Sequence, residues 1–67
     1  MKTIKELRLE RDLTQRELAE EMQVSESLIS MYESGQRSPS LKMAVKLSKF
    51  FGVALDDIFF KTQLHSQ

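Results

Sequence analysis

Residues 14–35, TQRELAEEMQVSESLISMYESG, decide the fold of this chain. Thr14 and Glu17 form a capping box, in which the hydroxyl accepts from a free N–H at the helix start and the carboxylate reaches back. Ser25 is a good N-cap for a second helix, and Gly35 supplies its C-terminal stop. Apolar residues fall at helical spacing in each half: Leu18, Ala19 and Met22, then Leu28, Ile29 and Tyr32. The stretch therefore predicts two short helices joined by a tight turn.

The second helix of this stretch leaves a small polar face outside. At about 100° per residue its buried side lies near Ile29 and Tyr32, so the opposite side points away from the neighbouring helix. The outward residues are Glu26, Ser27, Ser30, Met31 and Ser34. The pattern alone leaves two interpretations open. The face is solvated, as in any helical bundle, or it enters the major groove of DNA, which is wide enough to admit a helix.

An ordered set of residues extends along nearly the whole chain, from about residue 3 to 60. It comprises Leu13-Thr14-Gln15, Glu17-Leu18-Ala19, Val24-Ser25, Ile29-Ser30, Tyr32-Glu33, Gly35, Arg37, Pro39-Ser40-Leu41, Gly52-Val53 and Leu55-Asp56. In this set the chain resembles the Cro/cI-type (Xre-like) helix-turn-helix DNA-binding domains of bacterial and phage regulators. It departs from them at Gln23, where the family usually has a glycine in a left-handed turn, at a cost of about 1 kcal/mol.

The resemblance implies double-stranded DNA as the partner and two sets of contacts to it. Phosphate contacts are expected from Thr14, Gln15, Ser25, Ser34, Gln36 and Arg37, and base contacts from Glu26, Ser27, Ser30 and Met31. A glutamate can accept from cytosine N4, a serine is permissive, and a methionine can meet a thymine methyl. Because that face carries no Arg, Asn or Gln, part of the specificity is expected to come from DNA shape. The alternative for Arg37 is a solvated side chain.

The chain before the motif predicts one more helix. Thr3 and Glu6 form a second capping box, which opens a helix that runs to about Arg11. Arg8 lies on this helix, and in the family that the chain resembles its counterpart commonly pairs with the glutamate that matches Glu33. Such a pair would tie the first helix to the end of the second motif helix. The alternative is a solvated arginine.

The chain after the motif predicts two further helices. Ser40 caps a helix over Leu41–Phe51, and Asp56 caps a short helix through Phe60. The face expected to meet the core comprises Leu41, Ala44, Leu47, Ser48 and Phe51. The other side carries Lys42, Lys46 and Lys49, which we interpret as a solvated stripe with only Lys42 near enough to meet a phosphate. We therefore predict an all-α, compact five-helix bundle with a lambda-repressor-like helix-turn-helix. It forms a single domain over residues 1–67, ordered at about 3–60, with a frayed tail.

The C-terminal end carries more apolar bulk than so short a chain can bury. The residues concerned are Phe50, Phe59, Phe60 and Leu64. One phenylalanine and Ile58 are expected in the core, and the surplus predicts an interface between two copies of the chain. A two-fold homodimer would bind a pseudo-palindromic operator, with half-sites about 34 Å apart.

The charge balance argues for modest non-specific DNA affinity. Ten Lys and Arg residues face ten Asp and Glu residues, so the net charge is zero. A basic domain is the usual sign of phosphate neutralisation. The charges are unevenly distributed, however. Residues 1–33 carry five basic and eight acidic side chains, whereas residues 34–67 carry five and two.

Other kinds of chemistry find little support in the sequence. The chain has no cysteine, and its one histidine, His65, has no companion for a metal site. The serines lack an activating base, Asp56 and Asp57 are explained by helix capping, and two glycines make no phosphate loop. No stretch has the length of a membrane span or a signal peptide core. We expect no enzyme activity, metal, cofactor, membrane contact or small-molecule substrate, and a cytoplasmic protein encoded by a bacterium or phage.

The sequence is compatible with two functions. The first is a sequence-specific DNA-binding transcriptional regulator, most simply a repressor. The second is a protein-interaction module, such as an antitoxin or antirepressor-type partner, that kept the fold and lost strong DNA binding. Zero net charge and the acidic Glu26 and Glu33 on the second motif helix favour the second function.

Overall fold

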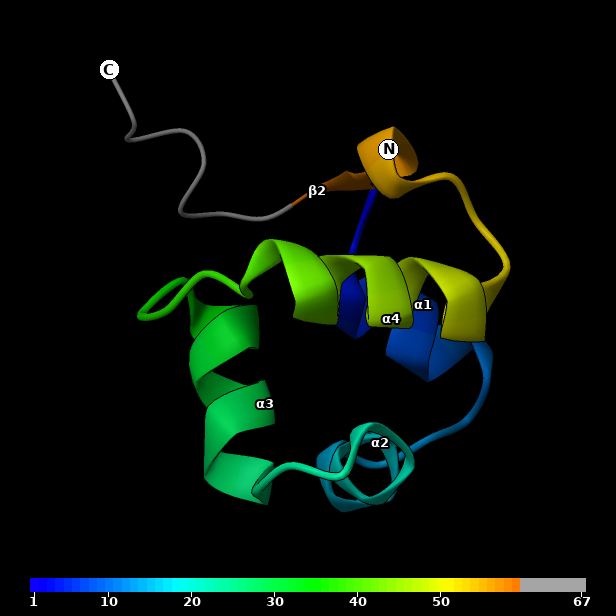
Figure 1. Cartoon of the computed structure of the whole chain (residues 1–67). Coiled ribbons are helices and arrows are strands. Elements are labelled where there is room, and N and C mark those ends of the chain that lie inside the picture. Colours follow the sequence, from blue (N-terminus) through cyan, green and yellow to red (C-terminus); the bar gives the residue numbers. More distant parts are fainter. Residues whose placement is uncertain (60–67) are drawn as a thin grey trace.

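Four α-helices, a 3₁₀ turn and two very short strands make up the computed structural model, which describes residues 1–59. In chain order the elements are β1 (Lys2–Thr3), α1 (Ile4–Glu10), α2 (Gln15–Met22), α3 (Glu26–Ser34), α4 (Leu41–Phe51), the 3₁₀ helix η1 (Leu55–Asp57) and β2 (Ile58–Phe59). Figure 1 shows α3 running across the direction of α4, with α2 seen end-on on the far side of α4 from β2. None of these helices is long and apolar enough to cross a membrane.

Polar caps begin all four α-helices, as the sequence predicts. The side chains of Thr3, Thr14, Ser25 and Ser40 each accept a hydrogen bond from the backbone N–H three residues on. At Thr3 and Thr14 the glutamate side chain also accepts from the cap backbone, which confirms both capping boxes. Because these bonds are local, the short helices have defined starts independent of the rest of the fold.

The core is formed by apolar side chains from each of the four α-helices and from β2. Leu18 of α2, Ile29 of α3 and Leu47 of α4 are fully buried, and Ile58 of β2 is nearly so. The remaining buried apolar residues are Ile4, Leu7, Ala19, Met22, Tyr32, Ala44 and Phe51. The two apolar stripes of the motif thus meet in one core, which fixes α2 against α3.

The predicted fifth helix is wrong. Residues Leu55–Asp57 form a single 3₁₀ turn whose N-cap is Ala54, so Asp56 lies inside the turn and does not cap it. The chain then becomes extended, and β2 pairs in parallel with β1, with Lys2 opposite Ile58. An isoleucine followed by a phenylalanine suits a strand, and this pairing satisfies backbone groups at both ends of the domain. The fold is therefore mostly helical, with four α-helices rather than five.

Leu41 is also placed differently from the prediction. It opens α4 and its side chain is 73% exposed, whereas Ala44 one turn later is buried. Leu41 lines an open apolar groove together with Pro39 and Leu55. Since the first turn of α4 lies over this groove rather than over the core, the helical spacing that includes Leu41 overestimates the core by one residue.

The expected interface residues can be followed only in part. Phe50 is half-buried, and its ring lies edge-on to Phe51 and beneath the guanidinium of Arg11. Phe59 belongs to β2, but its side chain, with Phe60, Leu64 and the tail expected to fray, lies outside the described residues. Their role in a dimer stays a prediction.

Candidate nucleic-acid interface

The outer side of α3 is a small polar face exposed to solvent. Glu26, Ser27, Ser30 and Ser34 are exposed, and Met31 is half-buried at the edge of the face. Within residues 1–59 the side chains of Glu26, Ser27 and Ser30 make no hydrogen bond, whereas the Ser34 hydroxyl donates to the Met31 carbonyl at 3.2 Å. The side chains expected to contact bases therefore share one accessible face that no neighbouring element covers.

The turn between α2 and α3 holds its shape without glycine. Gln23 has φ 61° and ψ 43°, so the left-handed conformation expected at this position is present. Its N–H donates to the carbonyls of Ala19 and Glu20, and the N–H of Val24 donates to Ala19 at 3.0 Å. These bonds close the end of α2 and offset the cost of a side chain in this region.

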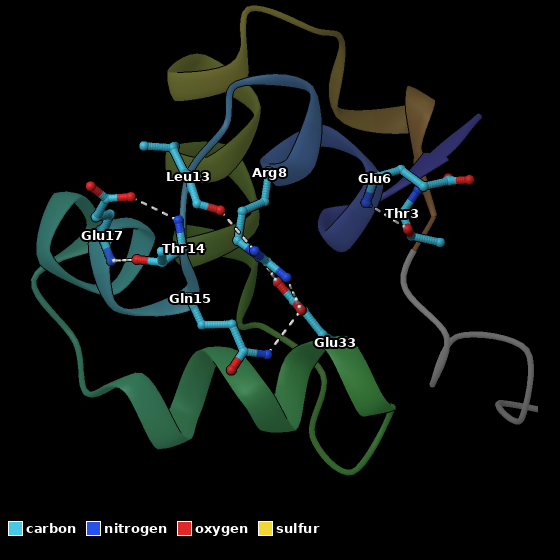
Figure 2. Close-up of polar contacts among 8 residues, drawn as sticks. All are labelled: Thr3, Glu6, Arg8, Leu13, Thr14, Gln15, Glu17 and Glu33. Carbon is cyan, nitrogen blue, oxygen red and sulfur yellow. Dashed lines mark hydrogen bonds and ion pairs between the residues drawn. The ribbon is translucent and has the colours of Figure 1, made fainter.

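A buried ion pair supports α3 from its inner side, as Figure 2 shows. Arg8 of α1 donates from Nε to Glu33 Oε2 at 2.7 Å and from Nη2 to Glu33 Oε1 at 3.1 Å. The two side chains are only 8% and 5% exposed. The predicted pair is thus confirmed as a two-pronged contact, which the planar guanidinium and carboxylate favour geometrically.

The same pair fastens the start of α2. Arg8 Nη1 donates to the carbonyl of Leu13 at 2.7 Å, just before the α2 cap. Gln15, the first residue of α2, donates from Nε2 to Glu33 Oε1 at 3.0 Å (Figure 2). Since a carboxylate can only accept, the amide nitrogen of Gln15 must face Glu33. One cluster therefore joins the beginning of α2 to the end of α3, and the sequence analysis missed the part played by Gln15.

Two of the hydroxyl groups expected to contact phosphates, those of Thr14 and Ser25, already accept internal bonds. Thr14 Oγ1 accepts from the N–H of Glu17 at 3.0 Å, and Ser25 Oγ accepts from the N–H of Leu28 at 3.1 Å. Each hydroxyl keeps its own hydrogen, which can still be donated to a phosphate oxygen. The caps that begin α2 and α3 are thus compatible with the expected phosphate contacts.

Gln36 and Arg37, in the loop after α3, offer their side chains rather than their main-chain N–H groups to a ligand. Gln36 and Arg37 are exposed, but their backbone N–H groups both donate to the carbonyl of Met31, at 3.0 and 3.2 Å. Arg37 makes no ion pair with any other described residue. A phosphate contact from Gln36 or Arg37 would therefore come from the side chain.

One lysine of α4 is not solvated as the stripe pattern suggests. Lys42 and Lys49 are exposed, whereas Lys46 is half-buried and its Nζ donates to the carbonyl of Met22 at 2.8 Å. No periodic signal in the sequence distinguishes Lys46 from its neighbours. Among the described residues no group of three or more His, Cys, Asp or Glu side chains could hold a metal ion.

Comparison with known proteins identifies the same motif. A family model described as helix-turn-helix matches residues 4–58. An uncharacterized HTH-type transcriptional regulator of Methanocaldococcus jannaschii is 50% identical over 48 residues, which cover 72% of this chain and 73% of that protein. The cryptic phage CTXphi transcriptional repressor RstR of Vibrio cholerae is 42% identical over 55 residues, which cover 82% of this chain and 50% of that protein.

A third relative is named as an activator rather than a repressor. The HTH-type transcriptional activator BcrR of Enterococcus faecalis is 38% identical over 61 residues, which cover 91% of this chain and 30% of that protein. The matched region is thus half or less of the two relatives whose names state a regulatory effect. No solved structure was found to match the chain.

Proposed function

Because the chain belongs to the helix-turn-helix family of transcriptional regulators, we propose that it binds specific double-stranded DNA sites through α3 and represses transcription there. The observation that carries the proposal is the contrast on α3: an exposed polar face on a helix whose other side is held by a buried ion pair. A helix fixed in this way can enter the major groove without rearranging the core.

The proposed phosphate contacts lie on both sides of this face. Thr14 and Gln15 begin α2, where free N–H groups and the helix dipole favour an anion. Ser25 begins α3, and the other contacts would come from Ser34, Gln36 and Arg37 at its end and in the loop that follows. Gln15 would bind a phosphate oxygen with its second amide hydrogen, because its first is donated to Glu33.

The proposed base contacts come mostly from short side chains. Glu26, Ser27, Ser30 and Met31 would approach base edges, with Glu26 accepting from cytosine and Met31 against a thymine methyl. None of these side chains makes a two-pronged contact with guanine or adenine. Part of the discrimination would therefore come from the shape and deformability of the operator.

We propose that the operator is bound by a homodimer, since one α3 reads only a few base pairs. Apolar side chains support an interface at the C-terminal end. Leu41 and Leu55 are 73% and 37% exposed beside the groove that also includes Ile58. The chain continues from β2 into Phe60 and Leu64, which would add to the same interface. In Figure 1, β2 lies on the other side of α4 from α2.

The second candidate function is a protein-interaction module with weak DNA binding. It is favoured by the zero net charge and by the exposed acidic residues Glu17, Glu20 and Glu21 along α2. Such a surface would repel phosphates if it lay close to the duplex. The two functions differ in what the isolated protein binds.

Selection from a random DNA pool tests the proposed function. Repeated rounds at low salt should enrich one pseudo-palindromic sequence, which gel shift should then show to bind far more tightly than a scrambled duplex. Pull-down from the native cell extract should be run in parallel. Failure to enrich any sequence, together with a stoichiometric protein partner, would favour the interaction module.

Two substitutions test the homodimer and locate its interface. Phe60→Glu and Leu41→Glu should each leave the helical content unchanged while shifting the protein to monomer in sedimentation velocity. Both should lose protection of paired half-sites in footprinting. Lys49→Glu, on the exposed side of α4, is the matched control and should remain dimeric. If both variants still protect two half-sites, the interface lies elsewhere.

A further inference from the structure

Lys46 makes a contact between α4 and the end of α2. Its Nζ donates to the carbonyl of Met22, the last residue of α2, at 2.8 Å. Lys46 is half-buried, unlike the exposed Lys42 and Lys49 on the same helix. Within residues 1–59 this is the one hydrogen bond that joins α4 to α2 or α3. The contact therefore reaches the motif at the turn from which α3 begins.

The end of α2 leaves backbone carbonyls available to a donor from outside the helix. The last four carbonyls of a helix have no partner inside it. Here the N–H groups of Gln23 and Val24 donate to the carbonyls of Ala19 and Glu20, and neither donates to the carbonyl of Met22. A lysine or arginine in the last turn commonly supplies such a donor, and α2 has none there.

The charge at this helix end is unfavourable without Lys46. The C-terminus of a helix carries a partial negative charge, and acidic side chains nearby add to it. Glu20 and Glu21 occupy the last turns of α2. The ammonium group of Lys46, delivered from α4, is therefore the positive charge that the sequence of α2 does not provide.

We propose that Lys46 is a positioning residue for DNA recognition, which holds the left-handed turn at Gln23 against α4 and so fixes the direction of α3. The inference rests on the proposed function, since it concerns the same face of α3. Only two residues, Val24 and Ser25, separate Gln23 from Glu26, the first residue of α3. Base contacts require placement to within about 0.5 Å, so movement of the turn would be passed directly to Glu26 and Ser27.

A direct phosphate contact is the competing role for Lys46. It lines a shallow groove with Lys42 and Ser40, where an ammonium group could meet the DNA backbone. The two roles differ in their salt dependence. A phosphate contact adds about one unit to the slope of log K against log salt and supports every DNA sequence equally, whereas a positioning residue supports mainly the correct sequence.

The test uses Lys46→Met, with Lys49→Met as the control that removes an equal charge from the exposed side of α4. Affinity is measured for the selected operator and for a scrambled duplex, at several salt concentrations and at a temperature where each variant is fully folded. For Lys46→Met we expect about tenfold weaker operator binding, little change on the scrambled duplex and an unchanged salt slope. Lys46→Arg, which keeps a charged donor, should recover most of the operator affinity.

Amide hydrogen exchange supplies a readout of the turn itself. The N–H groups of Gln23 and Val24 should exchange faster in Lys46→Met than in Lys49→Met. Operator affinity equal to that of Lys49→Met would overturn the inference, whatever the exchange rates. An equal loss on both duplexes with a slope lower by about one unit would instead assign Lys46 to phosphate. If the unaltered protein selects no DNA, the proposed function fails first and this role fails with it.

Discussion

The two sides of α3 have opposite chemistry although they belong to the same nine residues. The inner side buries Ile29, Tyr32 and Glu33, whereas the outer side exposes Ser27 and Ser30. Glu33 accepts from Arg8 and Gln15 in the interior of the protein. Within residues 1–59 the side chains of Ser27 and Ser30 make no hydrogen bond to another element. The inner side therefore determines where the helix lies, and the outer side is free to determine what it binds.

The two glutamates of α3 give the largest expected contrast. Glu33→Ala and Arg8→Ala should each lower the free energy of unfolding by about 3–5 kcal/mol, because the surviving charge is left buried without its partner. Urea unfolding of the purified variants measures this. Glu26→Ala, on the exposed first turn of the same helix, is the control and should change stability by less than about 0.5 kcal/mol.

A double-mutant cycle sharpens this first prediction. The variant that lacks both Arg8 and Glu33 should be much more stable than the sum of the single losses implies, because no unpaired charge remains. Additive losses would mean that the pair contributes nothing as a pair. Its two-pronged geometry would then be incidental to the stability of the fold.

Changes on the outer side should act on DNA and leave the fold intact. Glu26→Gln and Ser27→Ala should preserve the melting temperature, since neither side chain makes a hydrogen bond within residues 1–59. Each should shift base preference at one or two positions of a half-site, by about 1–3 kcal/mol. Renewed selection from a random pool, with the unaltered protein as reference, would show the shift. An identical consensus for both variants would contradict direct base contacts from these residues.

A substitution in the turn that leads into α3 should change stability less than the loss of the ion pair does, and should raise it rather than lower it. Gln23→Gly should raise the free energy of unfolding by up to about 1 kcal/mol, because glycine adopts φ 61° without steric cost. Thermal unfolding monitored by circular dichroism provides the measurement. Asp12→Gly, at φ 57° in the turn before α2, is the matched control and should show a similar gain. A loss of stability in Gln23→Gly would mean that its side chain contributes more than its backbone strain costs.

A substitution in the loop after α3 should have the smallest effect, and it should act on DNA affinity. Arg37→Ala should weaken binding to the operator and to scrambled DNA by similar factors, and flatten the plot of log K against log salt by about one unit. Fluorescence anisotropy at five or more salt concentrations measures both quantities. A change in base preference without a change in slope would place Arg37 among the base-reading residues.

Local signals in the sequence predicted the four α-helices and which side of α3 is exposed. The caps at Thr14 and Ser25 and the apolar residues between them carry the information within a few neighbouring positions. The pairing of Arg8 with Glu33 was anticipated through the family resemblance, since the two residues are 25 positions apart. The periodicities of helices and strands relate only residues a few positions apart, so they could not have predicted this pair.

The parts that sequence reasoning missed all depend on distant segments. Ile58 lies in a strand because the N-terminal residues are there to pair with it, and two-residue strands carry no periodic pattern. Lys46 differs from Lys49 because Met22 happens to lie beside it. Leu41 is exposed because it lies at the edge of a groove that it shares with Pro39 and Leu55, both outside α4. Each of these facts follows from tertiary structure, which overrides local preference.

The pairing of β1 with β2 has a consequence for the order in which the domain assembles. It joins Lys2 to Ile58 and so closes nearly the whole chain into one loop. Closing a loop of this length costs about 3.5 kcal/mol in chain entropy, more than two residue pairs can return while the helices are unformed. β1 and β2 therefore meet last in folding, after the helices have brought them together.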